Sequence, residues 1–224
     1  MTLHNHTELE QGSDQWLAAR RGIVTASVIG QLITPTLKVA DNETSRGLTL
    51  TLTAERITGH VEPVFVSNAM LRGQMDEPLA RAWYSEHHAP VTETGFMVED
   101  KWGFPIGYSP DGLVGDDGLI EIKSRDPKIH LKTILAGEPP RENLAQMQTG
   151  MLVTGRPWCD YVSWCGGMRP YVVRVHADPA WADVLVVAAM ALEHNIATYI
   201  QTYEAATAGI EPTERIDHFA EIEF

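Results

Sequence analysis

Residues 107–125, GYSPDGLVGDDGLIEIKSR, narrow the possible structures of this chain more than any other segment. A turn signal, DDG at residues 116–118, has apolar residues on both sides and predicts a β-hairpin. The LIEIK segment after the turn alternates apolar and polar residues and predicts a strand. Glu121 and Lys123 then share one face of that strand, about 7 Å apart at roughly 3.3 Å per residue. Because the hairpin folds Asp111 back opposite Glu121, two carboxylates and one ammonium converge on one point.

This convergence favours a site for a divalent metal ion and an activated water. Asp111 and Glu121 supply two oxygens, and the backbone carbonyl of Ile122 supplies a third because it lies between the two inward side chains. Such hard oxygen ligands suit Mg²⁺, which lowers the pKa of a bound water and neutralises charge on a phosphate. Lys123 is placed to orient that water or to stabilise developing negative charge. The same residues also fit a surface hairpin that carries a Glu–Lys pair.

The composition bounds the class of protein. The 224 residues, 44% of them hydrophobic, are enough for one large domain or two small ones with a sizeable core. No run of about 18 apolar residues is present and the polar N-terminus lacks a hydrophobic signal region, so neither a membrane span nor a secretory signal is expected. Cys159 and Cys165 lie close together in one strand-like segment, so we expect reduced thiols and a cytosolic setting.

The net charge of −13 argues against a protein that coats nucleic acid, because such proteins are usually basic. It leaves room for an enzyme that acts on nucleic acid, since such an enzyme needs positive charge only where the phosphates lie. A cluster of metal-binding acids also lowers the total charge. Local motifs therefore have to decide between the two.

The order of the predicted elements indicates an α/β fold. Helices dominate residues 13–87, strands and a helix pair follow over residues 90–176, and one long helix covers residues 178–206. We therefore expect a single domain over residues 1–224, with a mixed central β-sheet flanked by helices on both faces.

Two segments before the hairpin carry further candidate site residues. WLAARRGIVTAS places two arginines just before a predicted helix at residues 26–33, with Thr25 as its N-cap. Backbone N–H groups, the hydroxyls of Thr25 and Ser27 and one arginine can together hold a phosphate. A capped helix with solvated arginines explains the same residues. Likewise, Glu77 stands beside a possible helix start at Pro78, where the helix dipole alone favours an acid.

Four stretches, taken in order, resemble one nuclease family. SPDGLV and GLIEIKS are similar to the PD-(D/E)xK nuclease core, in which an Asp and a Glu-x-Lys lie on adjacent strands. WLAARRGIVTAS is similar to an Arg-x-Gly-x-x-Thr-Ala-Ser motif, RGQMDEPLARAWY to a Gly-x-x-x-Glu helix, and NLAQMQTGMLVTG to a Gln-containing helix. Together they cover roughly residues 13–165 and resemble the phage lambda exonuclease type, also called YqaJ-like viral recombinases.

The resemblance implies a role for each matching residue. The metal ligands would be the side chains of Asp111, Glu121 and Glu77 and the carbonyl of Ile122. The catalytic set would be Asp111, Glu121, Glu77, the catalytic lysine Lys123, and Gln146, which orients the lysine or the nucleophile. The pocket for a terminal 5′-phosphate would be lined by Arg20, Ser27 and Ser109. Contacts with DNA would come from Met70 or Leu71, Arg125, Lys128 and Lys132, whereas Glu99 and Asp100 lie near the place of a further family acid without matching its spacing.

The resemblance also implies an activity. Members of the family are processive 5′-to-3′ exonucleases that digest one strand of double-stranded DNA from its ends and leave 3′ overhangs for recombination by single-strand annealing. It implies Mg²⁺ as cofactor, with Mn²⁺ also accepted, and a ring-shaped homotrimer around the DNA. The implied partners are double-stranded DNA ends and a single-strand annealing protein, with no membrane. The implied location is the cytoplasm of a bacterial host, from a phage or prophage gene.

Three other functions fit parts of the pattern. A site-specific endonuclease of the PD-(D/E)xK type would cut closed circular DNA, whereas an exonuclease depends on an end. A non-catalytic DNA-binding module of the same fold is disfavoured by the intact Asp111, Glu121 and Lys123. A metal hydrolase with another substrate is disfavoured because the nine histidines lack ligand spacing.

Overall fold

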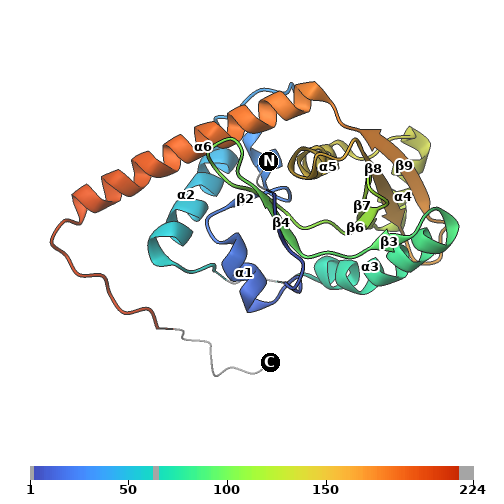
Figure 1. Ribbon diagram of the computed structural model, residues 1–224, viewed down its shortest axis with the longest axis horizontal. Helices are drawn as coiled ribbons and strands as arrows, with labels where there is room; N and C mark the ends of the chain where they lie inside the picture. The colour runs from blue at the N-terminus through green and yellow to red at the C-terminus, as the bar shows by residue number, and fades with distance from the viewer. Residues whose placement is uncertain (1–2, 63–65, 217–224) are drawn as a thin grey trace.

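The computed structural model describes residues 3–62 and 66–216 of the chain. It contains two mixed β-sheets with helices packed around them (Figure 1). One sheet has five strands and the other has four. The predicted mixed central sheet is confirmed as the five-stranded sheet, and the four-stranded sheet is an addition that the sequence did not predict.

The five-stranded sheet contains β3 (Val91–Thr92), β6 (Gly112–Val114), β7 (Gly118–Ser124), β8 (Trp158–Trp164) and β9 (Tyr171–His176), in that order across the sheet. The four-stranded sheet contains β1 (Leu3–His6), β4 (Phe96–Glu99), β5 (Ile106–Tyr108) and β2 (Val24–Thr25), again in spatial order. In the larger sheet β7 and β8 are parallel, and the other neighbours are antiparallel. A parallel pair needs a crossover connection. Two helices supply it, α4 (Pro127–Ala136) and α5 (Arg141–Thr154).

Strand β7 lies in the middle of the larger sheet, between β6 and β8. Its hairpin with β6 sets Gly112 opposite Ile120, which confirms the predicted hairpin. Leu119 and Ile120 point to opposite faces and are both 0% exposed, so both faces of the strand are covered. Such strands usually carry apolar residues only. Glu121 is a charged residue that is also 0% exposed, so it is an exception. Lys123 lies two residues later, at the half-buried end of the strand.

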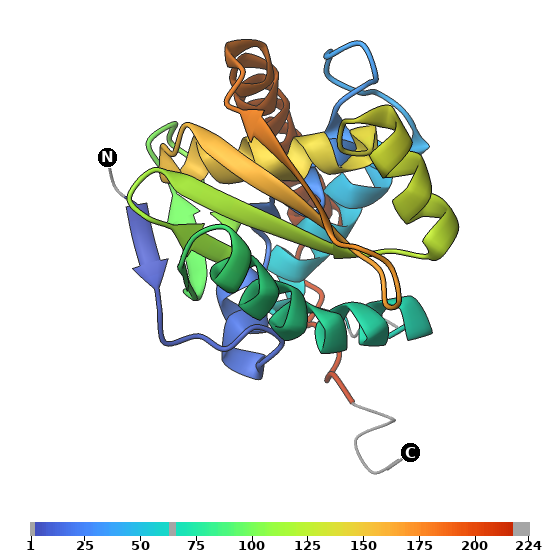
Figure 2. The ribbon, with the colours of Figure 1, turned by 90° about the vertical axis from the view of Figure 1, so that its right-hand side faces the viewer.

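Different helices cover the two faces of the larger sheet (Figure 2). On one face, α3 (Asn68–His87) packs Ala80 and Tyr84 against the side of the sheet that contains Ile120. On the other face, α5 packs Met147 into the main core, to which α2 (Glu43–Thr58) and α6 (Pro179–Ala206) also contribute. The predicted arrangement of helices on both faces is confirmed, and α3 runs unbroken through its internal proline.

The longest helix, α6 (Pro179–Ala206), runs along one edge of the molecule (Figure 1). It packs on α5 and on α2 (Glu43–Thr58), and a bidentate ion pair joins Arg56 of α2 to Glu193 at 2.6 and 2.7 Å. Length and composition alone would let α6 cross a membrane, whereas the sequence analysis expected no membrane span. Its inner stripe nevertheless belongs to the protein core, through Val184, Leu185, Ala188, Ala189, Leu192 and Ile196.

The N-terminal region differs from its prediction after α1 (Asp14–Arg20). The helix predicted over residues 26–33 is wrong, because only Ile29–Leu32 forms a helical turn, of the 3-10 type. Val24 and Thr25 form β2, which pairs parallel with β5. Both residues are β-branched and favour extended backbone. Pairing with a distant strand therefore overrode the local capping signal.

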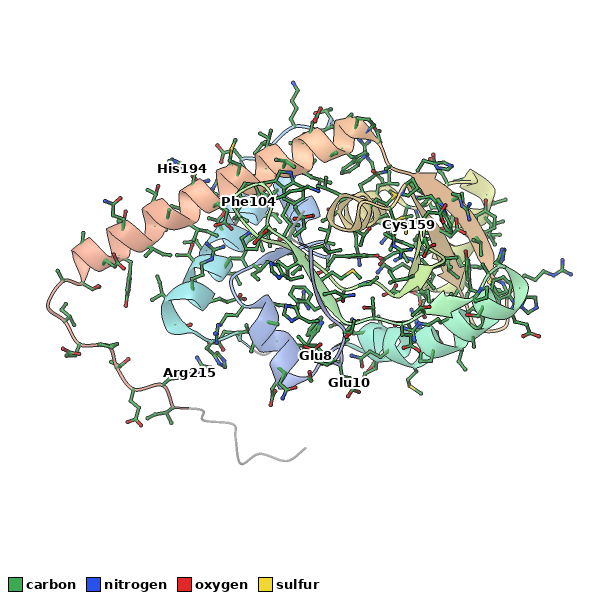
Figure 3. The ribbon with its side chains drawn as sticks, viewed as in Figure 1. Glu8, Glu10, Phe104, Cys159, His194 and Arg215 are labelled. Atoms are coloured by element: carbon green, nitrogen blue, oxygen red, sulfur yellow. The ribbon has the colours of Figure 1, made fainter. Side chains whose placement is uncertain are left out.

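Both cysteines are buried and free. Cys159 lies on β8 in register with Leu119 of β7, in the interior of the molecule (Figure 3). Burial, together with the nearby charge of Glu121, raises the pKa of the Cys159 thiol well above its ordinary value. The thiol is therefore neutral and behaves as a small core residue.

A buried ionic cluster fixes α3 to the sheet. Asp160 of β8 is 4% exposed, and its carboxylate accepts a hydrogen bond from the Tyr84 hydroxyl at 2.6 Å. Arg174 of β9 donates two more, at 2.7 and 2.9 Å, and its guanidinium stacks 3.5 Å from the ring centroid of Trp158. Three donors thus satisfy one buried carboxylate and join α3 to β8 and β9.

We expect Tyr84→Phe to lower the free energy of unfolding by about 1–2 kcal/mol. The substitution removes one hydrogen bond to a charged group, while Arg174 still satisfies Asp160. Urea denaturation followed by circular dichroism measures the change. An unaltered midpoint would show that this bond does not hold α3 in place.

Candidate active site

Asp111 lies where the hairpin prediction placed it, directly before β6 and across from β7. Its Oδ2 accepts a hydrogen bond from the backbone N–H of Ile122 at 2.6 Å. The residue is 8% exposed. This bond ties the carboxylate to the strand that carries Glu121, so the hairpin by itself brings the two acids together.

Glu121 and Lys123 form an ion pair on the same face of β7. Oε1 of Glu121 lies 2.5 Å from Nζ of Lys123. Apart from this contact with Lys123, neither carboxylate oxygen accepts a hydrogen bond among the described residues. A fully buried carboxylate without such bonds is costly. Lys123 is therefore the one contact that the described residues provide to this carboxylate.

The third acid, Glu77, comes from α3. Burial and the charge of Asp111 raise the pKa of Glu77 to about 7, although Arg81 and Lys123 oppose the shift. Burial also raises the pKa of Glu121 to about 8, against the attraction of Lys123, and Asp111 adds to the rise. The pKa of Asp111 is raised by burial too. Each acid thus lies within electrostatic range of another, and the three together favour a bound cation.

Lys123 remains a cation in this environment. Burial alone would lower the pKa of its ammonium, but the charges of Glu121 and Asp111 outweigh burial and raise it. A protonated lysine cannot remove a proton from water at neutral pH. The two predicted roles of Lys123 are to orient a water and to stabilise negative charge. The protonated ammonium group can perform either role.

The chemistry of this donor set fits a hard divalent ion. Three carboxylates and the Ile122 carbonyl are the oxygen ligands that Mg²⁺ and Mn²⁺ prefer. No group of three His, Cys, Asp or Glu side chains within residues 3–62 and 66–216 already has the spacing of a metal centre. Lys123 and Arg81 occupy an oxygen of Glu121 and of Glu77, respectively. A metal ion would therefore displace or share these ion pairs.

Gln146 lies half-buried on α5. Within the described part of the chain, no hydrogen bond joins it to the acids or to Lys123. The nearby Gln148 has a structural role instead, because its amide donates to the His176 carbonyl and accepts from the Asp178 N–H, both at 2.9 Å. The role predicted for Gln146 stays a prediction.

The residues predicted to bind a phosphate do gather in one place. Nη2 of Arg20 donates to the hydroxyls of Thr25 at 3.1 Å and Ser27 at 3.3 Å. The Trp16 ring lies 3.9 Å from the Arg20 guanidinium, and its indole N–H donates to Ser109 at 3.0 Å. Ser109 stands two residues before Asp111. Ser109 thus connects this cluster of residues with the acids along the chain.

Sequence reasoning did not select Trp16 as a site residue. The residue is 7% exposed and contacts two members of the pocket, Arg20 and Ser109. Its spacing of four residues from Arg20 on a predicted helix was the available signal, because residues four apart lie on one helix face. The bond to Ser109 joins residues 93 positions apart and has no local signal.

The residues predicted to contact DNA differ in how far they are exposed to solvent. Met70 is 45% exposed at the beginning of α3, and Lys128 and Lys132 are exposed on α4. Arg125 is committed inside the protein instead, since its Nε donates to the Tyr161 hydroxyl at 3.1 Å and its Nη2 binds Asn143. These two nitrogens are engaged within the protein, and the predicted contact of Arg125 with DNA stays a prediction.

Glu99 has a structural explanation of its own. It is 2% exposed at the end of β4 and accepts hydrogen bonds from the N–H groups of Asp100 and Lys101, each at 3.1 Å. These bonds close the turn after β4 in the four-stranded sheet. Its geometry is that of a turn residue, and Asp100 lies 3.7 Å from His4 on the same edge.

Comparison with known proteins gives a consistent result. The family model of the YqaJ-like viral recombinase domain matches residues 15–157. An alkaline exonuclease from Laribacter hongkongensis is 34% identical with a TM-score of 0.80, over 89% of this chain and 100% of that one. The same values hold for that protein in complex with dAMP. A phage related exonuclease from Haemophilus somnus 129PT shares the fold at 14% identity and a TM-score of 0.64, over 81% of this chain and 96% of that one. A search of curated proteins finds no significant match.

We expect Glu121 to make the metal-free protein less stable as pH rises. Its pKa is raised from 4.5 to about 8 in the folded state, so the folded protein keeps a proton that the unfolded chain has released. The free energy of unfolding then falls between these two pH values. Glu121→Gln carries no charge and should lack this part of the slope. Urea denaturation in the presence of chelator, at about pH 6 and about pH 8.5, measures the free energy of unfolding of the wild type and of Glu121→Gln. An equal loss of stability in both proteins would contradict the raised pKa of Glu121.

Proposed function

The chain belongs to the YqaJ-like viral recombinase family and is a nuclease, and we propose that it is a metal-dependent 5′-to-3′ exonuclease acting on the ends of double-stranded DNA. One observation carries the proposal. Trp16 stacks on Arg20 and donates its indole N–H to Ser109, which stands two residues before Asp111 of the acid cluster. Two residues of extended chain span at most about 7 Å, the scale of one nucleotide. A pocket that holds a terminal phosphate would then place the next phosphodiester at the acids.

The acids and the lysine divide the chemistry. Asp111, Glu121, Glu77 and the Ile122 carbonyl would hold Mg²⁺, or Mn²⁺ in its place, which supplies an activated water and neutralises charge on the scissile phosphate. Lys123, held as a cation beside Glu121, would stabilise the negative charge that develops during cleavage. Burial of Asp111 and Glu121 strengthens these electrostatic interactions.

The pocket would set the direction of digestion. The Arg20 guanidinium and the hydroxyls of Thr25 and Ser27 are donors suited to a phosphate dianion. Burial lowers the pKa of Arg20, partly offset by Glu55, and arginine stays charged at any physiological pH. Holding a 5′-phosphate here would release nucleoside monophosphates from the 5′ end. The relative from Laribacter hongkongensis, solved with dAMP, binds a compound of that class.

The pH range of the activity follows from the acids. Because the pKa values of Glu77 and Glu121 are raised to about 7 and about 8, both ionise fully only in mildly alkaline solution. Metal binding needs the ionised forms. A preference for alkaline pH would agree with the name of the relative, an alkaline exonuclease.

The proposal extends to the partners. A ring-shaped homotrimer that encloses the duplex would need few basic residues, so that the net charge of −13 could reside on the outside. Exposed apolar residues support such an assembly, among them Met75 at 74% and Leu79 at 59% on α3 and Met190 at 54% on α6. The 3′ overhang would pass to a single-strand annealing protein in the cytoplasm of a bacterial host that carries the phage or prophage gene.

We expect Lys123→Ala to lower the rate of cleavage by about 10²–10³-fold, as for loss of a group that stabilises transition-state charge. Binding to DNA ends should change little, because Lys123 acts on the transition state. The measurement uses linear DNA and a closed circle, each with Mg²⁺ and with chelator. Lys101→Ala is the matched control, since Lys101 pairs with Glu99 at 3.6 Å in the other sheet. Retained turnover in Lys123→Ala, or cutting of the closed circle, would refute the proposed activity.

We expect Arg20→Ala to reduce digestion of 5′-phosphorylated ends by about tenfold or more, and to affect 5′-hydroxyl ends less. The reason is the loss of a charged donor to the terminal phosphate. Arg21→Ala serves as the control, because Arg21 is exposed and donates to the Gly59 carbonyl at 2.5 Å. Initial rates on the two kinds of end decide the question. Equal losses on both ends would mean that Arg20 only supports the local structure.

A further inference from the structure

Arg81 lies between two of the proposed metal ligands. It is one helical turn after Glu77 on α3, and its side chain is 15% exposed. Nη2 binds Oε1 of Glu77, and Nε donates to the backbone carbonyl of Asp111 at 2.7 Å. Nη1 lies 2.6 Å from Glu93. All three nitrogens of the guanidinium are therefore engaged, one with each of three different segments.

The two ligands need such a connection because they come from unrelated parts of the chain. Asp111 is fixed to β7 by its bond to the Ile122 N–H, whereas Glu77 belongs to a helix on the outside of the sheet. Another link between this part of α3 and the hairpin, from Ser124 to Asp76 at 2.6 Å, lies at the end of β7. Arg81 is the contact that reaches the backbone of Asp111 itself.

The shape of the guanidinium suits this task. It is planar, permanently charged and presents donors in a fixed fork, so it sets the direction as well as the distance of its partners. A lysine at the same place would keep the charge but would lack the fork. The charge also offsets the repulsion between carboxylates that are held close together.

We propose that Arg81 is a positioning residue that fixes the separation of Glu77 and Asp111 for the metal ion. This inference rests on the proposed function, in which both carboxylates serve the metal. Arg81 acts through the ligands, since it binds one oxygen of Glu77 and a carbonyl next to the Asp111 carboxylate. Oε2 of Glu77 takes no part in this ion pair.

Charge and geometry predict opposite effects when Arg81 is replaced. If Arg81 contributes only its charge, its removal leaves the site more negative and Mn²⁺ binds more tightly. If Arg81 sets the geometry, its removal lets Glu77 and Asp111 move apart and Mn²⁺ binds more weakly. Loss of a residue that orients metal ligands typically lowers metal affinity by about 10–100-fold. The sign of the change therefore separates the two explanations.

The test is titration calorimetry with MnCl₂, without DNA, on the full chain and on Arg81→Gln and Arg81→Lys. We expect both variants to bind Mn²⁺ about 10-fold or more weakly, and their cleavage to recover in part at high Mn²⁺ concentration. The value of kcat should fall more than KM for DNA ends rises. Affinity in Arg81→Gln equal to or tighter than that of the wild type would overturn the proposal. If Arg81→Gln does not fold, the same comparison is made with Arg81→Lys, and wild-type affinity there would overturn the proposal equally.

Three further variants make the result specific. Glu93→Gln removes the third contact of Arg81, with a residue whose side chain is 72% exposed, and should leave Mn²⁺ affinity within about twofold. Tyr84→Phe weakens the attachment of the same helix to the sheet and should lower stability without changing Mn²⁺ affinity. A loss of affinity in Tyr84→Phe equal to that in Arg81→Gln would overturn the specific role of Arg81.

The third variant, Glu121→Gln, distinguishes this inference from the proposed function. If it abolishes Mn²⁺ binding while both Arg81 variants keep full affinity, the metal site stands and the role of Arg81 is wrong. If it binds Mn²⁺ as the wild type does, the proposed metal site is wrong and the role of Arg81 is overturned with it. Weakened binding in Glu121→Gln and in both Arg81 variants supports the two together.

Discussion

A carboxylate in the middle of a covered strand is the constraint on which this structure depends. Glu121 is 0% exposed, and its surroundings provide one ion pair and no well-aligned hydrogen bond among the described residues. An isolated buried charge of this kind would cost several kcal/mol. The hairpin, the parallel partner β8 and the covering helices hold it there nonetheless. The hairpin also brings a second acid, Asp111, to the same place. Repulsion between the two carboxylates raises the free energy of the folded protein, and a bound cation would remove that repulsion.

The sequence predicts the parts of this arrangement that depend on local structure. Asp111, Glu121 and Lys123 lie on one hairpin, where the turn signal and the alternation of the strand set their positions. Glu77 and Arg20 come from distant helices, and only the resemblance of their motifs linked them to the site. The contacts of Arg81 with Asp111 and of Trp16 with Ser109 span 30 and 93 residues. No periodicity carries information about such contacts, so they had to come from the structure.

Short elements and paired charges account for most of the differences from prediction. Strand β2 is two residues long, Val24 and Thr25, and such a strand shows no alternation that could separate it from a helix start. Its pairing with β5 belongs to the four-stranded sheet, which explains why that sheet was not predicted. Arg125 follows β7, and its predicted contact with DNA stays a prediction. Its guanidinium donates hydrogen bonds to Tyr161 and Asn143, two contacts that the sequence alone does not reveal.

Two buried acids on neighbouring strands, Asp160 and Glu121, differ in how many hydrogen bonds they accept. Asp160 of β8, in register with Ile120, is 4% exposed and accepts three hydrogen bonds from Tyr84 and Arg174. Glu121, which follows Ile120 on β7, is equally buried, and Lys123 is its one charged partner among the described residues. The fold therefore gives Asp160 three hydrogen-bond donors. It gives Glu121 one ion pair, with Lys123, among the described residues. The contrast supports the proposal that a divalent cation completes the acid cluster, because carboxylate and carbonyl oxygens are the ligands that such an ion prefers.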